Sequence, residues 1–170
     1  MTDTRTRIAE CIATRPGIHF SELVRVLDLA PGQVQYHCRR LRKQERVVEE
    51  HLYGRTHYYD PEFDDWERAA IALAKRETAR DVLLFLLDEG AARPAAVADD
   101  LGIARSTLEY HLDRLVEQNL VEKQRGDGGR VTLSLARPSE TLRLLAEVEP
   151  SMPERMVDRF TRLLDDLLAD

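Results

Sequence analysis

Apolar residues recur at helical spacing in two segments of the chain. Val34, His37, Cys38 and Leu41 follow an i, i+3, i+4, i+7 pattern, and Leu108, His111, Leu112 and Leu115 repeat it. This spacing gives a stripe along one side of a helix, which must face a core. Each segment follows a tight turn, DLAP or GIAR, and Pro31 suits the first helical position because its missing N–H is not needed there.

Two further helices are predicted before each of these segments. The first has apolar positions at Ile8, Cys11 and Ile12, and in the second half of the chain at the run VLLFLL, residues 82–87. Gly17 and Gly90 are expected at left-handed C-caps. The next helix is short, with Ser21 expected as its N-cap in the first half. Its apolar faces are Leu23, Val24 and Leu27, and then Val97, Ala98 and Leu101.

Each predicted third helix is followed by two β-rich runs around a turn. RVVEEHLYGRTHYYD turns at Gly54, and LVEKQRGDGGRVTLSL turns at a Gly-Asp-Gly-Gly segment. Three helices followed by a hairpin, with a short turn before the third helix, is the order of a winged helix-turn-helix.

The two halves are copies of one module. When Leu27 is set against Leu101, residues 23–49 align with 97–123 without a gap. The identical pairs are Leu27/Leu101, Ala30/Ala104, Tyr36/Tyr110, His37/His111, Arg40/Arg114, Leu41/Leu115, Gln44/Gln118 and Val47/Val121. We therefore predict a mainly α protein with small β-hairpin wings, built from two winged helix-turn-helix domains at 1–60 and 77–136.

Helical segments join and follow these domains. Residues 61–76, with Trp66, Ala70 and Leu73 on one face, are expected to form a linker helix that runs into the second module. Residues 137–170 predict C-terminal helices that form either a lid on the second core or, as we favour, a homodimer seam. The residues of this seam are Met156, Phe160, Leu163, Leu164 and Leu167.

Composition limits the classes of protein. The 170 residues are 43% hydrophobic and 33% charged, as in folded globular proteins, and no apolar run approaches the length of a membrane span. A cytoplasmic location is expected. The formal net charge is −6, so any DNA-binding site must be a basic region confined to one part of the protein surface. Lysine occurs only at Lys43, Lys75 and Lys123 among many carboxylates, which suggests a halophilic, salt-rich cytoplasm.

The segment GIARSTLEYHLDRLVEQNLVEK resembles the recognition segment of ArsR-like and MarR-like winged-helix transcription regulators. The whole chain resembles archaeal proteins that carry two such modules in tandem. This resemblance implies a chromosome-associated transcription regulator that binds double-stranded DNA, with the third helix in the major groove and the wing on the flanking backbone. The cysteine-pair motif of metal-sensing members is missing from the sequence, so metal regulation is not implied.

The outward residues of the two recognition helices differ in charge. The first helix carries Gln33, Gln35, Tyr36, Arg39, Arg40 and Lys43, with Arg55 at the wing tip, and residues 31–59 sum to about +3. Arg can bind guanine in a bidentate manner and Gln can do so with adenine. The second helix carries Thr107, Glu109, Tyr110, Asp113, Arg114 and Glu117, and residues 105–130, which include the wing residues Arg125 and Arg130, are about neutral. We expect the first module to be the principal reader.

Other interpretations stay open at this point. Arg39, Arg40 and Arg42 could be a solvated helix face, and the acidic second helix could belong to a protein-binding scaffold. A third alternative is an architectural chromatin protein that binds DNA broadly with little base readout. His37 and His111 are expected to be packing residues, and Cys11 and Cys38 buried hydrophobes. His51 and His57 could approach each other on one hairpin without making a zinc site. We find no catalytic pattern, and we expect no enzyme activity, metal or cofactor. The sequence does not indicate an effector.

Overall fold

The computed structural model describes residues 3–148, 165, 168 and 169. The chain divides into two compact units, Met1–Ala72 and Leu73–Asp170, and each is described by itself. In the described part of the chain, no helix has the length and apolar character that a membrane span requires.

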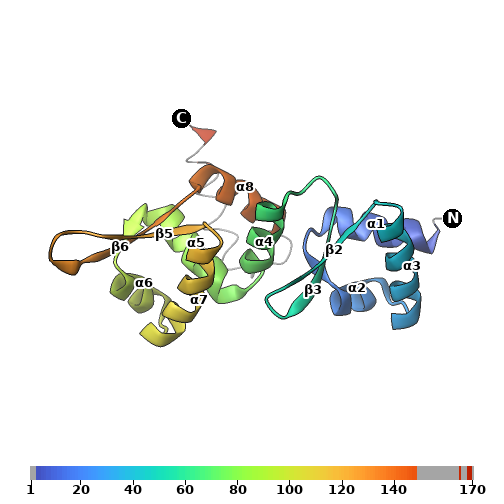
Figure 1. Ribbon diagram of the computed structural model, residues 1–170, viewed down its shortest axis with the longest axis horizontal. Helices are drawn as coiled ribbons and strands as arrows, with labels where there is room; N and C mark the ends of the chain where they lie inside the picture. Colours follow the sequence, from blue (N-terminus) through green and yellow to red (C-terminus); the bar gives the residue numbers. More distant parts are fainter. Residues whose placement is uncertain (1–2, 149–164, 166–167, 170) are drawn as a thin grey trace. The chain divides into compact units, whose positions relative to one another are not determined.

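The first unit has the helix and strand order of a winged helix (Figure 1). It runs through α1 (Thr4–Thr14), β1 (Ile18–His19), α2 (Phe20–Leu27), α3 (Pro31–Lys43), β2 (Val48–Leu52) and β3 (Arg55–Tyr59). The strands form an antiparallel sheet in the order β1-β3-β2, with Leu52 paired to Arg55. Tyr53 and Gly54 connect β2 to β3, and both have positive φ, as the two-residue turn of a tight hairpin requires.

The second unit repeats this order. It contains α5 (Glu77–Glu89), β4 (Ala91–Ala92), α6 (Pro94–Leu101), α7 (Arg105–Glu117), β5 (Val121–Arg125), β6 (Val131–Leu135) and α8 (Pro138–Val148), and its sheet has the order β4-β6-β5. The turn between β5 and β6 is longer than in the first unit and contains a short 3-10 segment, η1 (Asp127–Gly129). The fold expected from the sequence, two winged helices in tandem, is confirmed.

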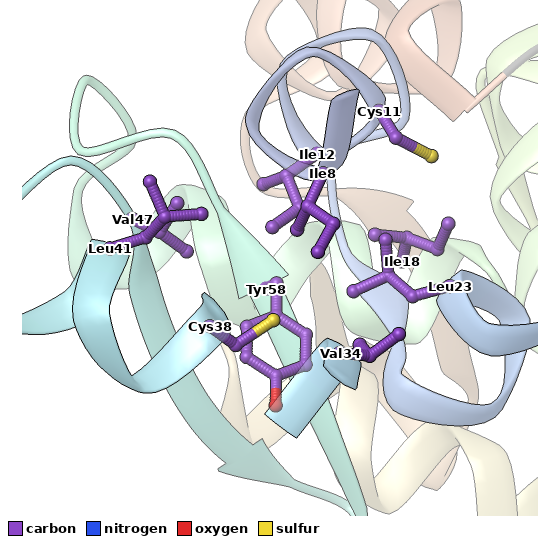
Figure 2. Packing of buried hydrophobic residues seen from close by; sticks show 10 residues of the cluster. All are labelled: Ile8, Cys11, Ile12, Ile18, Leu23, Val34, Cys38, Leu41, Val47 and Tyr58. Carbon is purple, nitrogen blue, oxygen red and sulfur yellow. The ribbon is translucent and has the colours of Figure 1, made fainter. Parts of the chain in front are cut away.

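The core of the first unit lies among its three helices and its sheet (Figure 2). Helix α3 contributes Val34, Cys38 and Leu41, each at most 1% exposed, so the stripe predicted from the sequence faces inward. The other members are Ile8, Cys11, Ile12, Ile18, Leu23, Val47 and Tyr58. Full burial of each aliphatic side chain contributes about 1.5–3 kcal/mol, and this anchors α3 with one face fixed outward.

The same backbone hydrogen bonds end the third helix in both units. The amide of Arg46 donates to the carbonyl of Leu41 (3.0 Å), and the amide of Leu120 donates to that of Leu115 (2.9 Å). The residues just before these donors, Glu45 and Asn119, have φ of 56° and 60°. Each helix thus ends in a Schellman motif, and equivalent positions of α3 and α7 are held in equivalent backbone surroundings.

Three local expectations differ from the structure. Ser21 lies inside α2, whose N-cap is His19, because the two-residue strand β1 brings the chain into the helix earlier than expected. Gly17 has positive φ but follows the end of α1 at Thr14, so it forms the turn into β1. The linker is not continuous with the second module, because α4 (Asp65–Ala74) ends and Arg76 is extended before α5 begins.

Helix α8 begins at Pro138 and packs against α5 through a buried apolar face that includes Leu142 and Leu145. The predicted seam residues Met156, Phe160, Leu163, Leu164 and Leu167 lie outside the described residues. The homodimer therefore stays a prediction.

Candidate nucleic-acid interface

The outward face of α3 is polar, basic and exposed. Burial of the core stripe leaves six side chains exposed on the other side of the helix: Gln33, Gln35, Tyr36, Arg39, Arg40 and Lys43. Among the described residues, no carboxylate lies within ion-pair distance of Arg39, Arg40 or Lys43. These cations are therefore available to an external anion.

Tyr36 and Arg40 lie one turn apart and contact each other. The Arg40 Nη1 donates to the Tyr36 hydroxyl at 3.3 Å, and its guanidinium carbon is 5.7 Å from the ring centroid. The Tyr36 side chain remains 50% exposed. An arginine restrained by an aromatic neighbour loses less rotamer entropy on binding, while its remaining donors stay directed outward.

Arg42 is already engaged within the first unit. Its Nη1 lies 3.2 Å from the Glu49 carboxylate on β2. This pair borders a hollow between α3 and the hairpin that is also lined by Gln35, Arg39 and Tyr58. The basic surface of α3 therefore depends on Arg39, Arg40 and Lys43 more than on Arg42.

The first wing carries Arg55 directly after its turn. Arg55 is exposed, and its Nη1 lies 3.3 Å from Nε2 of His19 on β1. His57, also on β3, is buried, and its Nδ1 lies 2.6 Å from the Gly17 carbonyl, to which it must donate. His51 is paired with Thr56 in the strand register, so it projects from the opposite face of the hairpin to His57.

The expected approach of His51 to His57 is thus wrong, because neighbouring strand positions alternate between faces. Within the described part of the chain, no group of three His, Cys, Asp or Glu side chains is arranged to hold a metal ion.

The second recognition helix repeats the Tyr–Arg contact. The guanidinium carbon of Arg114 lies 4.6 Å from the ring centroid of Tyr110, which is 54% exposed. Thr107, Asp113 and Glu117 are also exposed on this face. The two helices therefore share one aromatic–cation element and differ in the charges around it.

Glu109 is neutralised within the second unit. Its carboxylate lies 2.7 Å from Nζ of Lys123 on β5 and 3.6 Å from the Arg105 guanidinium. The hydrogen bond from Lys123 is the main cause that holds the pKa of Glu109 below its ordinary value. The negative field of α7 toward solvent consequently comes from Asp113 and Glu117.

His37 and His111 occupy equivalent, partly buried positions. Each ring makes an edge contact with the preceding tyrosine at a centroid distance of 5.1 Å. Burial, followed by the nearby charges of Arg114 and Arg76, lowers the pKa of His111. His111 is therefore a neutral packing residue at pH 7.

The second wing is open and rich in glycine. Arg125 and Arg130 are exposed on either side of its turn, which is closed by the Gly126 amide donating to the Arg130 carbonyl at 2.8 Å. Gly128 and Gly129 have positive φ, a conformation that permits this tight turn.

Both cysteines are buried, as the sequence predicts. Burial, with a smaller contribution from Glu49, raises the pKa of Cys38 to about 12, and burial also raises the pKa of Cys11. Neither thiol is positioned to act as a nucleophile or metal ligand at neutral pH.

Two features of this surface could not be predicted from the sequence. One is the neutralisation of Glu109, since Lys123 comes from another element and shares no helical period with it. The other is the group around His19, which depends on the pairing of β1 with β3. A two-residue strand gives no alternation by which sequence patterns can detect it.

Comparisons with known proteins give matches to both units. Residues 2–71 match a family described as an N-terminal HTH domain, and residues 73–124 match one described as a helix-turn-helix domain. An uncharacterised HTH-type transcriptional regulator of Methanocaldococcus jannaschii is 28% identical over 131 residues, which are 77% of this chain and 33% of that protein. The chain thus spans about a third of the length of this relative.

Solved structures of Lactococcus lactis ZitR mutants are also similar. One double mutant has a TM-score of 0.34 at 23% identity, over 55% of this chain and 73% of that one. A single mutant has a TM-score of 0.30 at 21% identity, over 81% of this chain and 94% of that one.

Proposed function

We propose that this chain, whose two units match helix-turn-helix families, is a tandem winged helix-turn-helix regulator that controls transcription by sequence-selective binding of double-stranded DNA on the chromosome. The observation that carries this proposal is the outward face of α3. It combines cations that have no carboxylate within ion-pair distance among the described residues with glutamine and tyrosine side chains. These are the groups that bind base edges and phosphates in a major groove.

The first module is the principal reader in this proposal. Arg39, Arg40 and Lys43 are free of ion pairs in the described contacts, whereas the corresponding positions of α7 are Asp113, Arg114 and Glu117. Carboxylates that face a phosphate backbone oppose binding. The second module then contributes through Arg125 and Arg130 of its wing, which flank a turn that can lie along the backbone.

The protein acts as a homodimer in this proposal, and the operator has two-fold symmetry with half-sites set by the dimer geometry. Support comes from the apolar positions near the C-terminus, from Met156 to Leu167.

The test compares equivalent residues of the two modules. Selection from random duplexes, or mapping of bound DNA in the native organism, first gives an operator. Binding of Arg40→Ala and Arg114→Ala is then titrated on the operator and on a scrambled duplex at several salt concentrations. Arg40→Ala is expected to lose about 1–3 kcal/mol of operator affinity and to relax preference at one base step. Arg114→Ala is expected to lose less.

The affinity losses of these two variants show which module contacts DNA. The two arginines have the same helical position and each lies near a tyrosine ring, but Arg40 is exposed and Arg114 is half-buried. The binding losses are therefore compared after the free energy of unfolding of each variant has been measured, so that the difference reports DNA contact. Equal losses would mean that both helices enter grooves.

A second candidate function is a protein-binding scaffold, favoured by the exposed Asp113 and Glu117 on α7. If the protein binds no selected duplex more tightly than scrambled DNA at any salt concentration, the result favours this scaffold over the regulator.

A further inference from the structure

His19 lies at the root of the first wing, in contact with charged groups from two elements. Its Nε2 is 2.7 Å from the Glu22 carboxylate on α2 and 3.3 Å from Nη1 of Arg55 on β3. Its Nδ1 is 3.3 Å from the Ser21 hydroxyl. The ring of His57 lies edge-on at a centroid distance of 5.8 Å. Glu22, Arg55 and His57 are the charged or titratable groups whose contacts with this ring the structure describes.

The two contacts of Nε2 require different states of that atom. An arginine nitrogen only donates, so a hydrogen bond from Arg55 needs a lone pair on Nε2. The Glu22 carboxylate only accepts, so its contact needs a hydrogen on the same atom. A neutral ring with its hydrogen on Nδ1 holds Arg55, since the Ser21 hydroxyl accepts that hydrogen.

Protonation removes the state of the His19 ring that accepts a hydrogen bond from Arg55. Both ring nitrogens then carry hydrogens, Nε2 donates to Glu22, and the imidazolium repels the Arg55 guanidinium. The His19 and Glu22 side chains are only 19% and 16% exposed, so solvent screens this repulsion less than it would on an open surface. The neighbouring His57 donates through its own Nδ1 to the Gly17 carbonyl.

The second unit provides an internal comparison. His19 is the N-cap of α2, and Arg93 is the N-cap of α6, with extended backbone at both positions. Neither side chain makes an N-cap hydrogen bond. The position that is a histidine in the first unit is therefore occupied by a permanent cation in the second.

We propose that His19 is a positioning residue for Arg55, and that its protonation releases the Arg55 guanidinium from the wing root toward a DNA backbone phosphate. This inference rests on the proposed function, because Arg55 must meet DNA. The release of Arg55 makes DNA affinity rise as pH falls from 8 to 6, the range in which histidine side chains titrate.

The experiment measures binding of the full chain to an operator duplex at pH 8 and pH 6 over a series of salt concentrations. The wild-type protein is expected to bind about three- to tenfold more tightly at pH 6, with a salt dependence steeper by about one ion. His19→Gln, which stays neutral and can accept from Arg55, is expected to bind with the weaker affinity at both pH values. His19→Arg, which introduces the residue found at the equivalent position 93, is expected to bind with the tighter affinity at both.

Two further variants separate positioning from a direct effect. His51→Gln changes a histidine on the same hairpin that contacts Thr56 and not Arg55, and it should keep the wild-type pH dependence. Arg55→Ala should abolish that dependence. If Arg55→Ala retains it, His19 acts on the phosphate by itself and the positioning role is wrong.

A measurement without DNA keeps the two proposals distinguishable. In NMR spectra of the free protein, the Arg55 side-chain resonance should shift with the titration of His19, and this shift should vanish in His19→Gln. An Arg55 resonance that does not respond overturns the inference whatever the DNA result. Failure to bind DNA at either pH, with the Arg55 shift present, overturns the proposed function alone.

Discussion

Glu45 and Asn119 occupy the same place after the third helix of each unit, and both have left-handed φ. This conformation costs an L-residue about 1–2 kcal/mol, and Asn tolerates it better than Glu because its short side chain can hydrogen-bond locally. The hydrogen bonds from Arg46 to Leu41 and from Leu120 to Leu115 enforce it at both positions. The first unit therefore carries local strain that the second largely avoids.

Glu45→Gly is expected to raise the free energy of unfolding by about 0.5–1 kcal/mol, because glycine relieves this strain at some cost in unfolded-state entropy. Chemical denaturation followed by circular dichroism gives the measurement. Asn119→Gly is the matched control and should stabilise less. A destabilised Glu45→Gly variant would mean that the Glu45 side chain makes a stabilising contact.

At the scale of elements, periodicity was sufficient for the long helices and insufficient for the short strands. The stripe from Val34 to Leu41 identified α3 and its buried face, and Pro31 marked its start, because both signals are local. Strands β1 and β4 have two residues each, so they give no period, and they are defined only by pairing with β3 and β6.

The same distinction applies to the candidate interface. The exposed residues of α3 follow from the burial of its stripe, so the sequence predicted them. The pairing of Arg42 with Glu49 and of Glu109 with Lys123 joins helices to strands, and only tertiary structure brings these residues together.

The ion pairs of Glu109 lead to a prediction about α7. Glu109→Gln should free Lys123 and Arg105 for phosphate and strengthen binding to operator and scrambled duplexes alike, by about two- to tenfold at low salt. Binding titrations at several salt concentrations provide the measurement. Asp113→Asn, which removes an exposed charge without releasing a described ion pair, serves as the comparison. A gain for Glu109→Gln on the operator alone would instead assign Glu109 to base discrimination.

At the scale of the whole molecule, the proposed dimer determines how many recognition helices meet one operator. A chain that ends at Val148 retains every element of both sheets and α8, but loses the apolar positions from Met156 to Leu167. If these positions bury apolar surface at about 25 cal/mol per Å², their loss should yield a monomer at micromolar concentration by light scattering. Phe160→Asp in the full chain should have the same effect. A dimer that survives both changes would place the interface elsewhere.

The matching ends of α3 and α7 also bear on how such a protein diverges after a duplication. Inward positions such as Leu41 and Leu115 are fully buried, while outward positions such as Arg39 and Asp113 contribute nothing to either core. Selection for folding and selection for a partner therefore act on separate residues of one helix. The outward residues of α7 can therefore be replaced by those of α3 without a change in the core. A chain that carries the outward residues of α3 on both helices should fold as this one does and present two basic helices to DNA.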